Sequence, residues 1–342
     1  CDIANGNLRV DGPARLKMNE VASRLSGLAG IQIVAEGIHE TPLEIRASRT
    51  DRGDVSLSVR GNLGWEMGEV AGVRFGPASI PVRLTETSVA VSPSRVPVGQ
   101  GHVNLAGQVH YRPGPLWMQL DRGVVAQSVQ LTREMTARWL KYLAPLAADT
   151  TRIDGTVGAE IDEAVIVIDH PEQSRVTGRL NLGGAQMTAG PLASQILAGV
   201  EQLKSLSRAI GAQPNPPSSR TWITMPAQKV DFAVSGGVVS HDRLFFEIDR
   251  AQVVTSGRVS LDGRLDMIAQ VPLDPRWLGS DLQGLAGQHV TLPIDGTLSR
   301  PSLDSSGVAR VVTQLGSQTL QNTAENYLQQ QLNRGIDKIF GR

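Results

Sequence analysis

The sequence contains very little cysteine and few aromatic residues. Its only cysteine is Cys1, so the chain can form no internal disulfide bond and no metal site built from several cysteines. Phenylalanine, tryptophan and tyrosine together make up 4% of the 342 residues. The apolar side chains are therefore mainly aliphatic, which favours a surface for flexible chains or loops over a tightly packed aromatic core.

The chain also lacks an excess of either charge and lacks long apolar runs. Lys and Arg number 33, Asp and Glu number 33, and no basic run stands out, which argues against nucleic-acid binding. No run of about 18 apolar residues occurs, so the sequence predicts no membrane-spanning helix. The longest apolar run, residues 164–168, has the length of a strand.

Signatures of catalysis and of metal or nucleotide binding are missing as well. The six histidines are scattered without the spacing of metal ligands: His39, His102, His110, His170, His241 and His289. No serine-nucleophile motif, phosphate-binding loop or dinucleotide-binding glycine motif is present. The sequence therefore predicts a protein that is not an enzyme, with no catalytic, cofactor-binding or metal-binding residues.

The sequence does contain a one-sided alternation of apolar and polar residues. In residues 257–271 (GRVSLDGRLDMIAQV), apolar residues alternate on both sides of Asp262–Gly263. Because side chains alternate between the two faces of a strand, each apolar set lines one face. A three-residue loop from Asp262 to Arg264 would pair Leu261 with Leu265 and keep both sets on one face. The sequence predicts that loop or an equivalent bulge.

Two other segments repeat this plan. Residues 178–187 alternate around Gly183–Gly184, for which we expect a two-residue hairpin loop. Residues 107–120 alternate around Arg112-Pro-Gly-Pro115, for which we expect a four-residue loop. In all three segments the loop length differs while the apolar residues stay in phase, so we expect one continuous concave apolar surface.

A glycine recurs in phase with the apolar residues. It occurs at Gly61, Gly107, Gly155, Gly178, Gly257 and Gly296. Glycine inside a strand often marks a bend, a bulge or a close approach, and strands bent at one level would curl a sheet around its apolar face. The alternative is chance, since the chain has 36 glycines.

Four segments have helical rather than strand periodicity. They are residues 16–28, with Val21, Leu25 and Leu28 on one stripe, residues 131–146, with Thr132 as N-cap, residues 191–210, and residues 308–340. The simplest interpretation is that these helices pack against the sheet; the alternative is that they plug or cap an open apolar trough. For the terminal helix, a partner or membrane-surface role is a further alternative.

Residues 230–304 resemble the C-terminal region of AsmA-like proteins, which include TamB- and YhdP-type chains. The resemblance rests on the alternating strand at VDFAVSGGVV, the LFFEI stretch, SGRVSLDGRLD, and the closing PIDGTLSRP. It implies a mostly β fold: a long curled antiparallel sheet that forms an apolar groove, capped by a few amphipathic helices and followed by a helical C-terminus. Within that fold we expect a first part of the curled sheet at residues 1–150, the AsmA-like β region at 151–305, and an amphipathic helical tail at 306–342.

The resemblance also implies a function. Such proteins lie in the periplasm of Gram-negative bacteria, are tethered to the inner membrane, and are implicated in moving phospholipids to the outer membrane. This chain shows no membrane anchor, so either that segment is absent from this sequence or a lipid on Cys1 replaces it; an excised fragment is the other interpretation of a chain beginning at Cys1. The expected partners are phospholipid acyl chains and inner- and outer-membrane proteins.

Two functional hypotheses follow. The first is a lipid-conducting groove lined by residues that share one strand phase: Phe232, Val234, Leu244, Phe246, Ile248, Val259, Leu261, Leu265 and Met267. The second is a structural or protein-interaction β-scaffold whose apolar face is closed by a second layer. The sequence does not reveal whether that face is covered.

Overall fold

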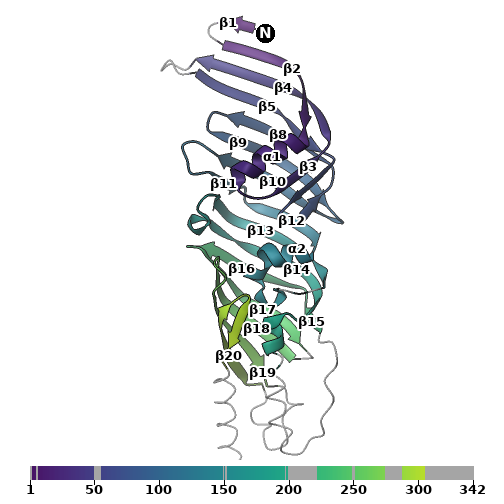
Figure 1. Cartoon of the computed structure of the whole chain (residues 1–342), viewed down its shortest axis with the longest axis vertical. Coiled ribbons are helices and arrows are strands. Elements are labelled where there is room, and N and C mark those ends of the chain that lie inside the picture. The colour runs from purple at the N-terminus through teal and green to yellow at the C-terminus, as the bar shows by residue number, and fades with distance from the viewer. Residues whose placement is uncertain are drawn as a thin grey trace, which may run out of the picture.

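The described residues form one long antiparallel sheet of 18 strands and a small sheet of three strands. The computed structural model describes residues 2–4, 7–49, 55–148, 150, 152–196, 198, 222–248, 251–273 and 287–304. Figure 1 shows the strands of the large sheet following one another along the long axis of the molecule, in nearly the order of the sequence. The predicted mostly β antiparallel fold is therefore confirmed. The expected terminal helix at 308–340 lies outside the described residues.

The large sheet is built from strands that span most of the chain. In its first half these are β1 (Asp2–Ala4), β2 (Asn7–Lys17), β4 (Ile38–Arg49), β5 (Val55–Trp65), β8 (Ala78–Thr85), β9 (Ser88–Val98), β10 (Gly101–His110), β11 (Trp117–Leu120) and β12 (Gly123–Gln130). In its second half they are β13 (Ile153–Val167), β14 (Arg175–Thr188), β15 (Trp222–Met225), β16 (Gln228–Ser235), β17 (Val238–Ile248), β18 (Ala251–Ser260), β19 (Leu265–Pro272), β20 (His289–Thr297) and β21 (Arg300–Leu303).

Each strand pairs mainly with the strands that precede and follow it in the chain. The ladder runs from β1 through β2, β4, β5, β8 and β9 to β10. Two short strands, β11 and β12, each pair with β10 on one side and with β13 on the other, and β13 pairs with β14. In the same way β15 and β16 each pair with β14 and with β17. The ladder then continues through β18, β19 and β20 to β21. The ladder crosses the expected boundary at residue 150 without interruption, because β12 pairs with β13.

The remaining elements are short. The small sheet contains β3 (Ile33–Glu36), β6 (Met67–Val70) and β7 (Val73–Phe75), and it packs beside helix α1 (Met18–Ala29). Between β12 and β13 lie α2 (Arg133–Met135), a π-helical turn (Thr136–Leu140), α3 (Lys141–Leu143) and a 3-10 turn (Pro145–Ala147). We call residues 133–147 the helical insert. A further 3-10 turn, Pro171–Gln173, joins β13 to β14, and residues 191–196 are helical.

The strand register confirms that the glycine-containing segments share one face. Gly107 lies opposite Leu120, Gly178 lies opposite Phe232, and Gly257 lies opposite Met267. Following these pairs from strand to strand places the alternating apolar residues of all three segments on the same side of the large sheet. We call this side the apolar face and the other side the charged face.

Two of the three expected loops need correction. Val259, not Leu261, lies opposite Leu265, so the loop has three residues but begins at Leu261 rather than at Asp262. Gly183–Gly184 is not a hairpin turn, because β14 continues through it from Arg175 to Thr188. There the register against β13 shifts, and the partner on the other side changes from β16 to β15. The glycine pair therefore marks a bulge, which preserves the phase of the apolar residues as a turn would.

The turn that contains residues 112–115 keeps the predicted phase, although the last paired residues are His110 and Trp117. Val109 lies opposite Met118, and His110 lies opposite Trp117. The rings of His110 and Trp117 stack on the charged face, with centroids 3.9 Å apart. The chain therefore turns between Tyr111 and Leu116 and returns with its apolar residues on the same face.

Close backbone approach explains why glycine occupies position 107. Its φ of 150° lies in a region that side chains disfavour, and a Cβ there would overlap the carbonyl oxygen of Gln119 on the neighbouring strand. We expect Gly107→Ala to lower the free energy of unfolding by about 1–3 kcal/mol, measured by urea denaturation. Gly12→Ala is the control, because a Cβ at Gly12 meets nothing within 4 Å, and it should change stability by less than about 1 kcal/mol. Equal losses in the two variants would contradict this explanation.

Helix α1 is present, but only the first residue of its predicted stripe packs: Val21 is partly buried against the cluster of Met18, Ala22 and Ala35. The stripe expected to pack was Val21, Leu25 and Leu28, yet Leu25 is 42% and Leu28 is 70% exposed. The buried residues are Met18 and Ala22, which pack with Ala35 of β3. The helix turns this side inward because Ser26 binds the backbone of Ile33, which fixes α1 against the small sheet.

Candidate functional site: the apolar face of the long sheet

The candidate site is the apolar face, which is covered over the second half of the sheet and open over part of the first half. In the second half, strands β13 to β20 contribute to a single large core. The buried residues that this core takes from the strands include Val157, Leu180, Leu182, Met187, Ile223, Met225, Leu244, Phe246, Ile248, Val253, Val259, Met267, Val271, Leu292 and Ile294. Each is less than a tenth exposed, so this half of the face resembles the interior of a globular domain.

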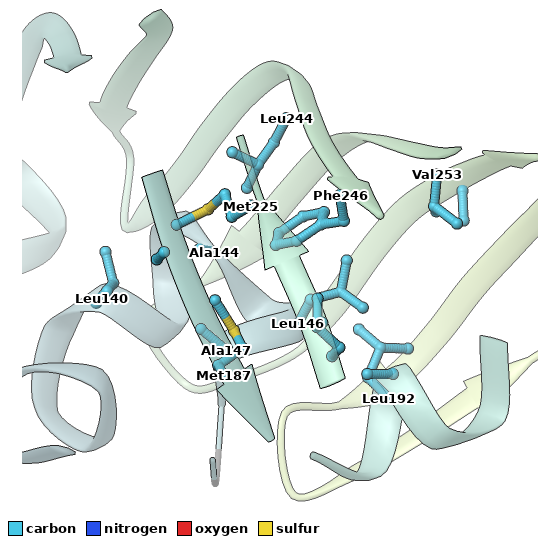
Figure 2. Close-up of a cluster of buried hydrophobic side chains, with 14 of the residues drawn as sticks. Leu140, Ala144, Leu146, Ala147, Met187, Leu192, Met225, Leu244, Phe246 and Val253 are labelled. Atoms are coloured by element: carbon cyan, nitrogen blue, oxygen red, sulfur yellow. The ribbon is translucent and has the colours of Figure 1, made fainter. Parts of the chain in front are cut away.

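The helical insert supplies the second layer of this core. Met135, Leu140 and Leu146 are at most 2% exposed and belong to the same buried cluster as the strand residues. Figure 2 shows Leu140, Ala144, Leu146 and Ala147 gathered with Met187, Met225, Leu244 and Phe246 of the strands. The prediction that this segment is helical and packs against the sheet is therefore confirmed.

Few polar contacts hold the insert in place. The hydroxyl oxygen of Thr132 accepts a hydrogen bond from the Met135 N–H at 3.2 Å, which confirms Thr132 as the N-cap. At the other end, the Tyr142 hydroxyl donates to the carbonyl oxygen of Leu261 at 3.3 Å. Apolar burial therefore supplies most of the contact between insert and sheet.

The helix predicted at 191–210 contributes to the same core as far as it is described. Leu192, Ala193 and Ile196 are buried within the cluster, and the Gln195 side chain donates to the carbonyl oxygen of Pro301 at 2.8 Å. Val200 and Leu203, which the sequence places on the same stripe, lie outside the described residues.

In the first half of the sheet the apolar face is open in part. Ile80, Val96 and Val98 are 7% exposed or less, and β7 packs beside Val98, so one end of these strands is covered. Leu57 of β5 is 41% exposed, Leu84 of β8 is 39% exposed, and Val10 of β2 is 37% exposed. The register places all three on the apolar face: Val10 lies opposite Ile45, Leu57 lies opposite Ala47, and Leu84 lies opposite both Val59 and Val89. We call the exposed and partly exposed residues of the apolar face between β2 and β10 the open stretch; Ile80, Val96 and Val98 are buried and do not belong to it. Its other residues are partly exposed: Ile45, Val59, Val82, Val89, Val91 and Val109.

Most of the lining residues predicted from the sequence lie in the covered half. Leu244, Phe246, Ile248, Val259, Leu265 and Met267 are all 6% exposed or less. Phe232 and Val234 are partly buried on the same face, and Leu261 lies in the turn after β18. The structure thus brings the candidates together on the apolar face, but it places six of them inside a closed core.

The sequence reasoning did not select the residues of the open stretch. Leu57, Val82 and Leu84 alternate with polar residues in the same way as the residues that were selected. Gly61, which is in phase with the apolar residues around it, could have identified this part of the sheet.

The charged face carries ion pairs along the molecule. Glu44 lies near Arg9 (3.3 Å), Arg60 (3.8 Å) and Arg46, all on the same side of β2, β4 and β5. Farther along, Arg179 lies 2.9 Å from Asp231, and Arg258 lies 2.5 Å from Asp266. The charged face is therefore a solvated surface along both halves of the sheet.

A hollow of about 1010 Å³ lies on the first strands of the sheet. Its lining includes Arg60 and Arg83 together with Asp11, Glu40 and Glu44. The register places these five residues on the charged face. Because acidic and basic side chains alternate there, the hollow has no single sign of charge that would select an anion or a cation.

One buried side chain on the apolar face is titratable. His241 is 5% exposed and lies between Phe232 of β16 and Gly257 of β18. Its Nε2 lies 3.4 Å from the Thr255 hydroxyl, and its Nδ1 has no hydrogen-bond partner. Burial lowers the pKa of His241 to about 4, against a smaller opposing effect of Asp242, so the imidazole is neutral at pH 7.

Within the described ranges, no group of three or more His, Cys, Asp or Glu residues could hold a metal ion. No helix among those residues is both long and apolar enough to cross a membrane. Comparisons of the chain with protein-family models, with curated proteins and with solved structures find no match.

Proposed function

We propose that the protein binds phospholipid acyl chains along its apolar face, as a bacterial envelope protein that takes part in phospholipid transport between the inner and outer membranes. The observation that carries the proposal is the open stretch. There a row of aliphatic side chains on consecutive strands stays partly exposed, although the same face is fully buried farther along. In the proposed fold the sheet curls around this face, and the register shifts at its bulges support that curvature.

An acyl chain suits the open stretch physically. Burial of each methylene contributes roughly 0.8 kcal/mol, so a chain lying across several strands gains free energy without any directed polar contact. Aliphatic side chains such as Val82, Val91 and Val109 offer a surface without hydrogen-bonding groups. Such binding requires no catalytic residue, cofactor or metal ion.

The helical insert defines where such binding would end. It belongs to the core that fills the apolar face over β13 to β20, where six of the residues expected from the sequence to line the groove are buried. In this proposal the open stretch is the lipid-binding part, and Leu244, Phe246 and Met267 contact lipid only if the insert moves away.

Site-specific photocrosslinking in cells tests the proposal. A photoreactive residue at position 84 should give lipid adducts, because Leu84 is exposed on the apolar face. The same residue at position 83 is the control, because Arg83 is exposed on the charged face one residue away. Lipid extracted with the position-84 variant but not with the position-83 variant would support the proposal. Equal labelling, or none at either position in the folded protein, would contradict it.

A second candidate is a structural or protein-interaction scaffold. The closed core under the helical insert favours it, since a half of the sheet already buries its apolar face as an ordinary two-layer domain does. Native mass spectrometry of protein purified in mild detergent separates the two. Bound phospholipid supports the first candidate, and lipid-free protein together with protein adducts at position 84 supports the scaffold.

The cellular location belongs to the proposal too. A periplasmic location, a tether to the inner membrane and contacts with inner- and outer-membrane proteins rest on the resemblance of residues 230–304 to AsmA-like proteins. Fractionation of the bacterial source tests them, because recovery of the protein in the cytoplasmic fraction would contradict the envelope function.

A further inference from the structure

Two arginines lie directly opposite each other on the charged face of the first half of the sheet. Arg60 of β5 pairs in register with Arg83 of β8, and both line the hollow on the first strands. They share this face because Val59 and Val82, their neighbours along the strands, project to the apolar face. Like charges at opposite positions of an antiparallel pair repel each other. A negative group between the two guanidinium groups would relieve this repulsion.

The hollow as a whole has no single sign of charge, but its carboxylates are not equally shared among its arginines. Asp11 lies 2.8 Å from Arg9, and Glu40 lies 3.9 Å from Arg15. These four residues belong to β2 and β4, and β5 separates those strands from β8. The two pairs therefore leave little negative charge for Arg83.

The third carboxylate that lines the hollow, Glu44, is divided among three arginines. Glu44 of β4 lies opposite Arg60, at 3.8 Å from its guanidinium group. The same carboxylate lies 3.3 Å from Arg9 and also contacts Arg46. Arg60 is therefore only partly neutralised.

Arg83 has no polar partner within the described ranges. No hydrogen bond or ion pair joins its side chain to another residue of those ranges. Its opposite residue on β9 is Ala90, and the carboxylate nearest along the chain, Glu86, accepts a hydrogen bond from the Leu57 N–H. The guanidinium group of Arg83 is thus an uncompensated positive charge beside a second, partly compensated one.

We propose that Arg60 and Arg83 bind a phosphate group in this hollow. Guanidinium groups present N–H donors in a planar fork that matches two phosphate oxygens, and two such forks come here from adjacent strands. Asn62 and Ser92 line the same hollow, and their amide and hydroxyl groups supply uncharged donors. Because a phosphate is tetrahedral, it can accept from donors on several sides, which suits this set better than a planar carboxylate does.

The volume of the hollow, about 1010 Å³, is larger than a phosphate ion requires. The phosphate group can therefore belong to a larger molecule, either a soluble phosphate ester or a phospholipid headgroup. The site lies on the charged face, so it does not depend on the binding of acyl chains that we propose for the opposite face.

Titration of the full chain with inorganic phosphate, at constant ionic strength in chloride, tests the site by calorimetry. We expect saturable binding that Arg83→Gln weakens by at least about tenfold, because charge-assisted hydrogen bonds are lost. Arg15→Gln is the matched control, since it removes the same charge from the same face but does not line the hollow. It should change the affinity by less than about twofold, because salt screens the more distant charge.

Vesicle sedimentation distinguishes the two sources of the phosphate group. The probes are phosphatidylcholine vesicles with and without phosphatidic acid. Sedimentation that requires phosphatidic acid and is lost in Arg83→Gln would assign the site to a phospholipid headgroup. Phosphate binding without sedimentation would assign it to a soluble phosphate ester. Both outcomes support the site.

Thermal unfolding gives an independent readout. Without phosphate, Arg83→Gln should melt at the same temperature as the unmodified chain or higher, because it removes a repulsion and breaks no contact of the described residues. Added phosphate should raise the melting temperature of the unmodified chain and of Arg15→Gln, but not that of Arg83→Gln. An unmodified chain that neither binds phosphate nor responds to it overturns the proposal. Equal responses of the unmodified chain and Arg83→Gln overturn it as well.

Discussion

Met267→Glu is expected to destabilise the protein by about 3–5 kcal/mol, whereas Ile268→Glu should change its stability by less than about 1 kcal/mol. Met267 is 3% exposed, on the apolar face between Gly257 of β18 and Ile294 of β20. A carboxylate there has no cation or hydrogen-bond donor to compensate for lost hydration. Ile268 is 36% exposed on the charged face, where water solvates a glutamate.

Urea denaturation of both variants, followed by circular dichroism, measures the difference. The two positions are adjacent in the same strand, so strand propensity and local sequence contribute almost equally to both. Comparable losses at 267 and 268 would show that the two faces of β19 are not distinct in burial. A large loss at 267 alone also predicts that a photoreactive residue there captures lipid only when the helical insert is displaced.

The period-two alternation was enough to predict which residues share a face. Val259, Leu265 and Met267 lie together because their spacing fixes the side of the strand on which each side chain projects, whichever residues form the turn. The turn itself was harder to place. Gly183–Gly184 satisfies the requirements of a hairpin and those of a bulge, and only the partner strands β13, β15 and β16 decide between them.

Coverage of the apolar face could not be predicted from local patterns. The helical insert directly follows β12 in the sequence, yet its buried residues pack with Met225, Leu244 and Phe246, which come from strands much later in the chain. Likewise α1 buries Met18, Ala22 and part of Val21 but leaves Leu25 and Leu28 exposed, because it packs against β3 of the small sheet together with Leu16 and Trp65. Both outcomes depend on contacts between distant segments, which spacing along one segment does not encode.

Stability is expected to fall between pH 6.5 and pH 4 because of His241, the second large effect. The ordinary pKa of histidine is 6.5, and burial lowers that of His241 to about 4 in the folded protein, with Asp242 opposing. The unfolded chain therefore binds the proton more readily than the folded chain in this range. The stabilisation of the folded state by the neutral imidazole is fully present above pH 6.5 and is lost as the pH falls toward 4. At about 1.36 kcal/mol per pH unit, the loss reaches about 3 kcal/mol.

The surroundings of His241 explain why the folded state resists protonation. Phe232 and Gly257 lie opposite it on the two neighbouring strands, and Thr255 is its nearest polar contact, so none of these carries a charge. A second proton would have no acceptor at Nδ1, because no protein atom of the described residues lies within hydrogen-bonding distance of it. Protonation would therefore bury a cation without a partner, which favours opening of β16, β17 and β18.

His241→Gln isolates this effect. Glutamine keeps an amide that can reach the Thr255 hydroxyl but does not titrate, so the free energy of unfolding of the variant should decline less steeply between pH 6.5 and pH 4. All other titrating groups, including Asp262, whose pKa is lowered mainly by the Ser260 hydroxyl, are common to both proteins and cancel in the difference. Urea denaturation across this range should show the stability curves of the two proteins converging by about 3 kcal/mol as the pH falls. Curves that stay parallel would mean that the imidazole of His241 is hydrated or hydrogen-bonded in the folded protein. The apolar face at β17 would then be more open than the 5% exposed fraction of His241 indicates.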